Sequence, residues 1–386
     1  MKILTLCYEY PPLGGGGGRV AQSVARQLVR RGHDIRVQTA ALGWSSTEEN
    51  DRGVHVFCTA SGRAKADTCR VHEMAMYCAT SFLPTLRHLR SWRPDVIHVH
   101  FAVPTGFLAL PVHRLTGVPY VITAHLGDVP GGVPEQTDHL FDLVGPLAGR
   151  IWSSAAACTA VSSFVQELAT RAYERPVVRI LNGIDLSDAT PPGSRVASNA
   201  PRAPRHLVFV GRMSVQKNPL FMVDVLAHLR DADWRLSLIG DGPLLPEVRD
   251  RIAIHGLGDR ITIHGWLDGA AVQDVLRSAQ ILVMPSLSEG LPIAAIEALK
   301  HSLAIVATDV PGVDDVVEHE RNGLRIPLGD TSAFASALNR LITDDRALSA
   351  MRQASWEMVR AFDLNAITDQ YERVLQEAAA SREHAL

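Results

Sequence analysis

The sequence holds few cysteines, and they are scattered. Five cysteines occur among 386 residues, and no two form a Cys-x-x-Cys pair. An odd number of widely spaced cysteines indicates neither a disulfide framework nor a zinc site. The chain also has no apolar run of about 18 residues, so no transmembrane helix is expected. The apolar stretch after Lys2 is too short for the core of a signal peptide. We therefore expect a protein of the cytoplasm.

Two common nucleotide-binding fingerprints are also missing. A glycine tract, Gly14 to Gly18, follows the first apolar segment, but the register of a G-x-G-x-x-G motif would place Arg19 at its last glycine. No acid follows the second predicted strand, so a nicotinamide-dinucleotide site is excluded. The chain likewise has no G-x-x-x-x-G-K-[ST] P-loop. The tract is therefore either a flexible segment without a ligand or a loop whose bare backbone approaches a ligand closely.

The chain has no strong excess of charge, but its charge is unevenly spread. Residues 1–185 hold 18 Lys and Arg against 15 Asp and Glu, whereas the remainder holds 20 against 26. The first half includes a cluster of cations, namely Arg63, Lys65, Arg70, Arg87, Arg90, Arg93 and Arg114. These are either scattered solvated side chains or a patch for an anionic membrane surface or acceptor. No nucleic-acid partner is expected.

Continuous apolar segments alternate with helical patterns along the first half. Strands are expected at residues 2–7, 35–39, 54–59, 94–100, 120–124, 157–161 and 177–181, and helices at 19–31 and 67–92. Pro84 would break the second helix in one interpretation. Strands that are apolar throughout and joined by helices predict a parallel sheet covered on both faces. His98 and His100 share one face of a strand, but no third ligand at metal-binding spacing lies near them.

A second series of strands and helices follows a segment without apolar periodicity. Residues 187–205 are rich in Pro, Ser and Ala and are expected to be a linker. Beyond it, strands are expected at 206–210, 234–239, 261–264, 280–283, 304–307 and 324–327, and helices at 272–279, 293–300, 332–341, 347–359 and 365–380. The length also suits two domains. We predict a first domain at 1–186, the linker at 187–205, a second domain at 206–364 and a closing helix at 365–386.

Two cations flank the turn after the first strand of the second series. Arg212 and Lys217 lie five residues apart at the entrance of a helix, where cations are unfavourable. Their presence is explained if an anion lies between them, because Arg offers a fork to phosphate oxygens and Lys offers a point charge. The pair therefore predicts a phosphate-containing ligand.

A second anion site is expected after the strand at 280–283. The loop that follows reads Glu289, Gly290, Leu291 and Pro292, and it leads into a run of helix formers at 293–300 that contains Glu297. Proline is favoured in the first turn of a helix. The N–H groups of that turn have no partners within the helix and attract an anion such as a diphosphate. The two glutamates then lie about where the hydroxyls of a sugar or ribose could be bound.

This stretch, with a second Glu eight residues after the first, resembles the donor-site signature of retaining glycosyltransferases of family four (glycosyl transferases group 1), which have the GT-B fold. The resemblance covers nearly the whole chain and follows the family's order. It rests on Gly15 with Gly16, His125, Arg212 with Lys217, and Glu289 with Glu297. It implies an α/β protein with two Rossmann-like βαβ domains that face each other across a cleft, and a closing helix that crosses back to the first domain.

The resemblance also implies an activity. A retaining transferase would move a sugar from a nucleotide diphosphate donor, a UDP-sugar before a GDP-sugar, to a hydroxyl of a glycan, lipid-linked or small-molecule acceptor. The implied donor contacts are the backbone of Gly15 and Gly16 and residues Gly290, Leu291 and Pro292, the diphosphate-binding Arg212 and Lys217, the sugar-holding His125 and Glu289, and the ribose-binding Glu297. On the acceptor side we place Asp128, which alternatively orients His125, and Tyr10, together with the loops at 44–70 and 127–142. No metal or other cofactor is expected, because the two cations and the helix start would stabilise the leaving diphosphate.

Other functions share such a donor site. A sugar-nucleotide 2-epimerase of the same fold would release free UDP and an epimerised sugar without an acceptor, and a non-catalytic protein would only bind the sugar nucleotide. A phosphorylase of related fold would need a cofactor lysine in a much longer chain. The arginine cluster adds the hypothesis of peripheral contact with the inner face of an anionic membrane. The sequence indicates no oligomeric state.

Overall fold

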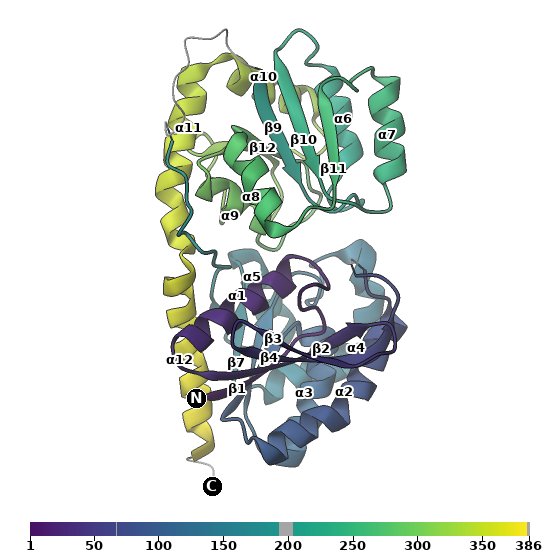
Figure 1. The fold of residues 1–386 in the computed structure, drawn as a ribbon, viewed down its shortest axis with the longest axis vertical. Helices are drawn as coiled ribbons and strands as arrows, with labels where there is room; N and C mark the ends of the chain where they lie inside the picture. The colour runs from purple at the N-terminus through teal and green to yellow at the C-terminus, as the bar shows by residue number, and fades with distance from the viewer. Residues whose placement is uncertain (67, 193–203, 384–386) are drawn as a thin grey trace. The chain divides into compact units, whose positions relative to one another are not determined.

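The computed structural model describes residues 1–66, 68–192 and 204–383, and the contacts within the chain divide it into two units (Figure 1). Unit 1 comprises Met1–Gly183 and Leu364–Leu386, and unit 2 comprises Ile184–Asp363. Most of the segment expected to be a linker, residues 193–203, lies outside the described residues. Its two ends belong to unit 2, because the Thr190 N–H donates to the Lys300 carbonyl at 2.9 Å and Arg205 is already part of a strand.

Unit 1 is built on one eight-stranded sheet. Its strands are β1 (Lys2–Leu6), β2 (Asp34–Leu42), β3 (Thr47–Asp51), β4 (Val54–Arg63), β5 (Val96–His100), β6 (Tyr120–Ala124), β7 (Ala157–Ala160) and β8 (Val178–Arg179), in the order β3-β4-β2-β1-β5-β6-β7-β8. The predicted strands are parallel, as their continuous apolar runs indicated. The antiparallel β3 was not predicted, because its sequence TEEND is polar and largely exposed.

The helices of unit 1 cover the sheet; two of the predicted helices differ in detail, and three further helices were not given bounds from the sequence. They are α1 (Gly16–Arg30), α2 (Val71–Ser91), α3 (Ala102–Thr116), α4 (Pro134–Ser154), α5 (Ser163–Tyr173) and α12 (Leu364–Glu383). Helix α1 begins three residues early, so that Gly16 to Gly18 form its first turn. A Cβ atom at Gly18 would lie 2.3 Å from the Glu9 carbonyl oxygen, which explains why this turn is glycine. Helix α2 continues through Pro84 without a break.

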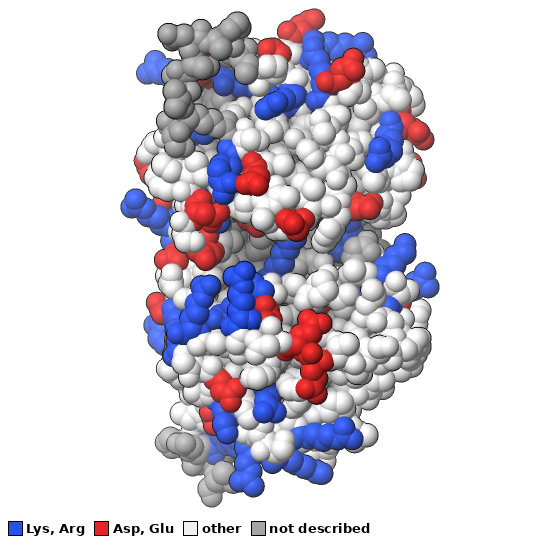
Figure 2. Space-filling view, in the orientation of Figure 1, with Lys and Arg blue, Asp and Glu red and all other residues white. Residues whose placement is uncertain are grey.

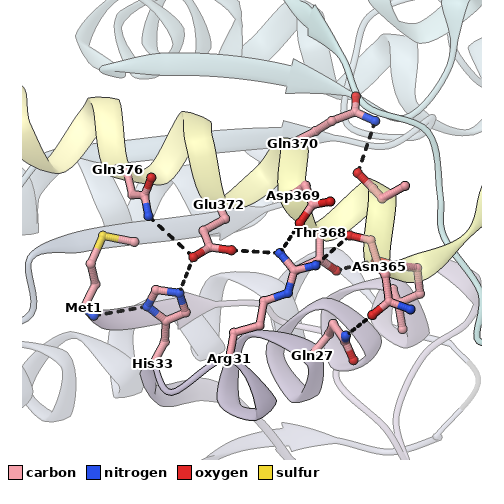
Figure 3. Close-up of polar contacts among 12 residues, drawn as sticks. Met1, Gln27, Arg31, His33, Asn365, Thr368, Asp369, Gln370, Glu372 and Gln376 are labelled. Atoms are coloured by element: carbon pink, nitrogen blue, oxygen red, sulfur yellow. Dashed lines mark hydrogen bonds and ion pairs between the residues drawn. The ribbon is translucent and has the colours of Figure 1, made fainter.

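Helix α12 belongs to unit 1 although it follows unit 2 in the sequence (Figure 3). Its buried residues Ile367, Tyr371, Leu375 and Ala378 recur at helical spacing. Polar contacts join it to α1 and the turn that follows. The Arg31 guanidinium donates to Glu372 at 2.8 Å and to the Asn365 carbonyl at 2.7 Å, and the His33 imidazole lies 2.8 Å from the other Glu372 oxygen. This network fixes the last helix on the first one.

Unit 2 repeats the same plan with six parallel strands. They are β9 (Arg205–Val210), β10 (Trp234–Ile239), β11 (Ile261–Gly265), β12 (Ile281–Met284), β13 (Ala304–Thr308) and β14 (Gly323–Ile326), in the order β11-β10-β9-β12-β13-β14. Its helices are α6 (Pro219–Ala227), α7 (Leu245–Ile254), α8 (Gly269–Ser278), α9 (Ile293–Lys300), α10 (Thr331–Thr343) and α11 (Asp345–Met358), followed by the 3-10 helix η1 (Val359–Phe362). Trp234, Phe334 and Leu338 lie in the apolar core between sheet and helices.

Candidate functional site

The two loops singled out in unit 2 start from neighbouring strands. Strands β9 and β12 pair with each other, whereas the chain after β9 leads to β10 on one side and the chain after β12 leads to β13 on the other. Ligands of open parallel sheets bind at such a switch point, beyond the carboxyl ends of the strands. Arg212 and Lys217 follow β9, and Glu289 follows β12. The fold therefore gathers at the switch point of unit 2 two residues expected to bind the diphosphate and one expected to hold the sugar of the donor.

Lys217 and Glu289 form an ion pair across these loops. The Lys217 Nζ lies 2.6 Å from Glu289 Oε1, although the residues are 72 positions apart. The Glu289 side chain is only 5% exposed, whereas that of Lys217 is 25% exposed. A carboxylate taken out of water needs a partner, and Lys217 supplies it. Both residues were predicted to lie in the donor-binding site, but their contact with each other was not predicted.

Backbone contacts hold the loops in this arrangement. The Gln216 side chain donates to the Ser288 carbonyl at 3.0 Å, and the Leu287 N–H donates to the Gln216 carbonyl at 2.7 Å. Gly312, after β13, has φ +84°, and a Cβ atom there would lie 2.1 Å from the Glu289 carbonyl oxygen. Only glycine allows this close approach. Glu289 is therefore enclosed by the loops after three adjacent strands.

Arg212 contrasts with Lys217, since its charge is not neutralised within the protein. The side chain is half-buried, and its guanidinium makes no hydrogen bond or ion pair with any residue that the structure describes. A half-buried guanidinium without a counter-ion is electrostatically unfavourable unless an anion binds there. Arg212 is thus the free cation of the switch point.

The start of α9 offers backbone donors at the same edge of the sheet. Pro292 is the residue immediately before the helix, one position earlier than expected, and its carbonyl accepts the Ala295 N–H at 3.0 Å. The N–H groups of Ile293 and Ala294 have no partner among the residues described. Gly290 and Leu291 lead into this turn, and Glu297 lies in the second turn with its side chain partly buried. The arrangement is that of an anion-binding helix terminus.

Two residues near this edge carry buried hydroxyls; the sequence indicates only that the loop beginning at Thr308 is either a plain turn or part of the site lining. Ser286 follows β12 and Thr308 ends β13, with 1% exposure each, and neither hydroxyl oxygen has a hydrogen-bond partner among the described residues. Such atoms are rare in proteins and call for an explanation. The sequence offered little signal, because serine after a strand is an ordinary turn residue.

In unit 1 the glycine tract lies close to His125. Gly15 precedes the first residue of α1, Gly16, and a Cβ atom at Gly17 would lie 2.5 Å from the Phe101 ring and 3.1 Å from His125 Nδ1. His125 follows β6, and its ring stacks on Phe101 with the centroids 4.3 Å apart. The structure therefore brings the glycine tract and the histidine together, with Gly17 in close contact with His125.

Two further histidines, His100 and His98, continue a row of buried rings that begins at His125. His100 Nδ1 is 3.3 Å from His125 Nε2, and the rings of His98 and His100 are 4.2 Å apart. Burial lowers the pKa of His125 to about 3, with a smaller contribution from His98, and burial lowers the pKa of His98 to about 3 as well. These imidazoles are therefore neutral at physiological pH. The sequence reading weighed His98 and His100 only as metal ligands.

Asp128 and Tyr10 are both buried. Asp128 accepts the His125 N–H at 2.8 Å and the Ala102 N–H at 2.7 Å, so it orients the backbone of His125 rather than its ring. Burial raises the pKa of this carboxyl to about 7, against the lowering effect of those N–H donors. Tyr10 as a whole is 1% exposed, and its hydroxyl donates a hydrogen bond to the Asp51 carboxylate at 3.1 Å. This geometry favours a structural role for Tyr10 over contact with an acceptor.

One member of the expected cationic cluster is not on the surface. Arg63 is fully buried, and it donates to the carbonyls of Lys65 at 3.0 Å and Ala66 at 3.1 Å. The other members are exposed: Lys65, Arg70, Arg87, Arg90, Arg93 and Arg114. Arg63 was misplaced because the sequence does not show which cations find enough oxygen acceptors to be buried.

No metal centre is evident in the part of the chain that the structure describes. No group of three or more His, Cys, Asp and Glu there could hold a metal ion. The single Asp-x-Asp triplet, Asp231 to Asp233, precedes Trp234, the first residue of β10. It therefore lies at the amino edge of the sheet, opposite the edge that carries Arg212. Within the described residues, none of the helices combines the length and apolarity needed to cross a membrane.

Comparison with known proteins identifies the family. Residues 14–188 match the model of Glycosyltransferase Family 4, and residues 204–344 match that of Glycosyl transferases group 1. The chain is thus an α/β protein of two units, each built on a largely parallel sheet. It belongs to the family-four glycosyltransferases. The D-inositol 3-phosphate glycosyltransferase of Arthrobacter sp. is 27% identical over an alignment 410 residues long, gaps included. The alignment covers 96% of this chain and 95% of that protein.

Solved structures agree on the fold. The sucrose-phosphate synthase of Thermosynechococcus elongatus aligns with a TM-score of 0.84 at 21% identity, over 98% of this chain and 99% of that one. The Anabaena protein HepE in complex with UDP-glucose aligns with a TM-score of 0.77 at 18% identity, over 97% and 99%. The predicted GT-B fold and the predicted family are both confirmed.

Proposed function

We propose that this glycosyltransferase moves a sugar from a UDP-sugar to a hydroxyl of a glycan, lipid-linked or small-molecule acceptor, with retention of the anomeric configuration and without a metal ion. The observation that carries the proposal is the free guanidinium of Arg212 at the switch point of unit 2. A diphosphate is the ligand whose charge and geometry match a guanidinium without a protein counter-ion. GDP is the second choice of nucleotide; the complex of HepE with UDP-glucose supports UDP.

The switch-point residues are suited to stabilise the leaving diphosphate. When the bond between the anomeric carbon and the phosphate oxygen breaks, negative charge grows on the diphosphate. Arg212 offers two parallel N–H donors, Lys217 offers a point charge, and the start of α9 offers the N–H groups of Ile293 and Ala294. The N–H groups are fixed by the fold and Lys217 is held by Glu289 before a ligand arrives, which favours effective electrostatic stabilisation. A metal ion is not needed for this task.

The acids are assigned to binding rather than to covalent chemistry. Glu289 is buried and already paired with Lys217, so we assign it to the hydroxyls of the transferred sugar and not to a nucleophilic role. Glu297 binds the ribose hydroxyls, and His125 of unit 1 contacts the sugar. Retention then follows if the acceptor oxygen attacks from the face that the diphosphate leaves. The acceptor proton passes to a phosphate oxygen of the leaving group.

Ligand-induced thermal stabilisation tests the donor site. A ligand that binds only the folded protein raises the melting temperature by mass action. UDP and UDP-sugars are expected to raise it for the wild type but not for Arg212→Ala or Glu297→Ala. The matched controls Arg235→Ala and Asp233→Ala alter exposed residues at the amino edge of the unit 2 sheet, opposite the edge that carries Arg212, and should respond like the wild type. Loss of the response in the controls, or its persistence in Arg212→Ala, contradicts the assignment.

Release of the sugar distinguishes transfer from epimerisation. In the presence of an acceptor extract, a transferase gives UDP and a glycosylated product in equal amounts, and the product keeps the anomeric configuration of the donor. Formation of UDP and a free 2-epimer without any acceptor would replace the proposed activity with that of an epimerase.

A second part of the proposal concerns the exposed face of α2 and α3. Four large apolar side chains on these packed helices are exposed, Val71 by 54%, Met76 by 38%, Leu83 by 62% and Leu115 by 66%. Arg87, Arg90 and Arg114 accompany them; the one acid of α2, Glu73, is buried, and α3 has none. Figure 2 shows Lys and Arg side chains among uncharged residues at the lower right, where Figure 1 draws α2. Cations beside exposed apolar groups fit an anionic lipid surface.

Vesicle sedimentation tests this contact. The full chain is expected to sediment with phosphatidylglycerol vesicles but not with phosphatidylcholine vesicles, and less at high salt because screening weakens the attraction. Arg87→Glu with Arg90→Glu should abolish sedimentation, whereas Arg235→Glu should not. Binding that is independent of salt and of lipid charge would contradict a membrane-facing role for this face.

A further inference from the structure

The imidazole of His125 has one nitrogen engaged within the protein and one that is not. Its Nε2 lies 3.3 Å from His100 Nδ1. Its Nδ1 faces Gly17 in the first turn of α1, where a Cβ atom would lie 3.1 Å away, and it has no hydrogen-bond partner among the described residues. The ring cannot easily turn over, because Phe101 stacks on its face. The chemistry that His125 offers to a ligand therefore depends on whether Nδ1 carries the proton.

The hydrogen bond to His100 decides this question. Both rings are neutral, since burial lowers the pKa of His125 to about 3 and that of His100 well below its ordinary value. A neutral imidazole has one donor and one acceptor nitrogen, so exactly one ring donates in the contact between them. If His125 donates from Nε2, His100 must carry its own proton on Nε2. If His100 donates from Nδ1, His100 Nε2 is a bare acceptor and His125 carries its proton on Nδ1.

The surroundings of His100 Nε2 favour the second arrangement. This atom is buried and has no hydrogen-bond partner among the residues described. A buried N–H without an acceptor is rarer in proteins than a buried acceptor without a donor. The tautomer of a histidine is set by the hydrogen bond that its other nitrogen makes. His100 therefore donates, and the proton of His125 lies on the nitrogen that faces the start of α1.

We propose that His100 is a positioning residue that holds His125 in the Nδ1–H tautomer, so that His125 donates a hydrogen bond to a neutral oxygen of the ligand, such as a sugar hydroxyl. This rests on the proposed function, which assigns the transferred sugar to His125. The neighbouring His98, whose ring packs on that of His100, is itself held by Thr123: the His98 Nε2 lies 2.8 Å from the Thr123 hydroxyl oxygen. The assignment goes beyond donor binding because it gives a role to a residue that does not itself contact the ligand.

Nitrogen NMR of the full chain labelled with 15N-histidine tests the tautomer directly. The signals of His125 are assigned with His125→Gln. We expect a protonated Nδ1 and an unprotonated Nε2 for His125 in the wild type. His100→Asn, whose amide nitrogen replaces Nδ1, should preserve this pattern. His100→Gln, which moves the amide towards the position of Nε2, and His100→Leu should lose it. A protonated Nε2 of His125 in the wild type, or an unchanged tautomer in His100→Leu, overturns the proposal.

Kinetics provides the second measurement. With the donor sugar identified, His100→Leu is expected to lower kcat about tenfold, as for the loss of one oriented hydrogen bond, and to change KM little, while His100→Asn restores most of the rate. His113→Asn on α3, where the ring nitrogen Nδ1 hydrogen-bonds to the Val118 carbonyl, is the control. If the NMR pattern holds but no sugar is transferred, the tautomer assignment stands and the proposed function fails. If transfer is normal in His100→Leu, the positioning role fails.

Discussion

The Lys217–Glu289 pair allows a sharp prediction, because its two members differ in burial. Replacing Lys217 with Met keeps the apolar part of the side chain and removes the charge, which leaves the Glu289 carboxylate, 5% exposed, without its partner. Removing one member of a buried pair costs about 3–5 kcal/mol. Because Lys217 is itself 25% exposed, we expect the lower end, a loss of about 3 kcal/mol in the free energy of unfolding of unit 2.

The opposite substitution should be milder. Glu289→Gln leaves a carbonyl oxygen that can still accept from Lys217, and the ammonium group can also turn towards water. We expect a loss of about 1 kcal/mol, the net value of an ordinary hydrogen bond. The double variant contains neither the buried unpaired charge nor the ion pair, and its loss should be about 2 kcal/mol, well below the sum of the single losses. Such non-additivity is the signature of a direct interaction.

Calorimetry of the full chain measures these losses. Unit 2 is recognised as the transition that moves with Leu338→Ala, a substitution in its core. The order expected for the melting temperature of that transition is wild type, then Glu289→Gln, then the double variant, then Lys217→Met. If Glu289→Gln is the more damaging single change, or if the two losses add, the pair does not neutralise a buried carboxylate in the way that the burial of its members implies.

Three further outcomes follow from the buried groups of unit 1. Since burial lowers the pKa of His98 and of His125 to about 3, neither imidazole should titrate between pH 5 and 8 in NMR spectra of the full chain. Asp128→Asn should lower stability by about 1–3 kcal/mol in thermal unfolding, because both carboxylate oxygens accept backbone N–H groups and an amide NH₂ would face one of these donors. The Arg31 guanidinium lowers the pKa of Glu372 below 4.5, so this contribution to stability is present above pH 4.5 and is lost as the pH falls through the folded-state pKa. The difference in melting temperature between wild type and Arg31→Ala should therefore shrink in acid, and a difference that is constant with pH contradicts this origin.

The sequence was a good guide wherever burial acts on a continuous segment. Strands such as β12 and β13 are apolar at almost every position because helices cover both faces of the sheet, and such runs are visible without any tertiary information. The cations after β9 were also visible, because their charge is unfavourable at a helix start. Features that depend on residues distant in the sequence could not be predicted. The β3 strand has a polar sequence and exists only because β4 offers it an edge, and the start of α1 lies within glycines that no propensity would assign to a helix.

Three arginines in this chain show why site residues are hard to recognise from sequence alone. Arg63 is fully buried, and backbone carbonyls and the Glu9 carboxylate satisfy it. Arg31 is satisfied by carboxylates and a carbonyl of α12. Arg212 alone of the three has no protein partner among the residues described. The residue type is the same in each case. The number of acceptors that the fold supplies distinguishes the two structural arginines, Arg63 and Arg31, from the ligand-binding candidate Arg212. An unsatisfied cation at a switch point is costly for the protein by itself, and binding of an anionic ligand removes that cost.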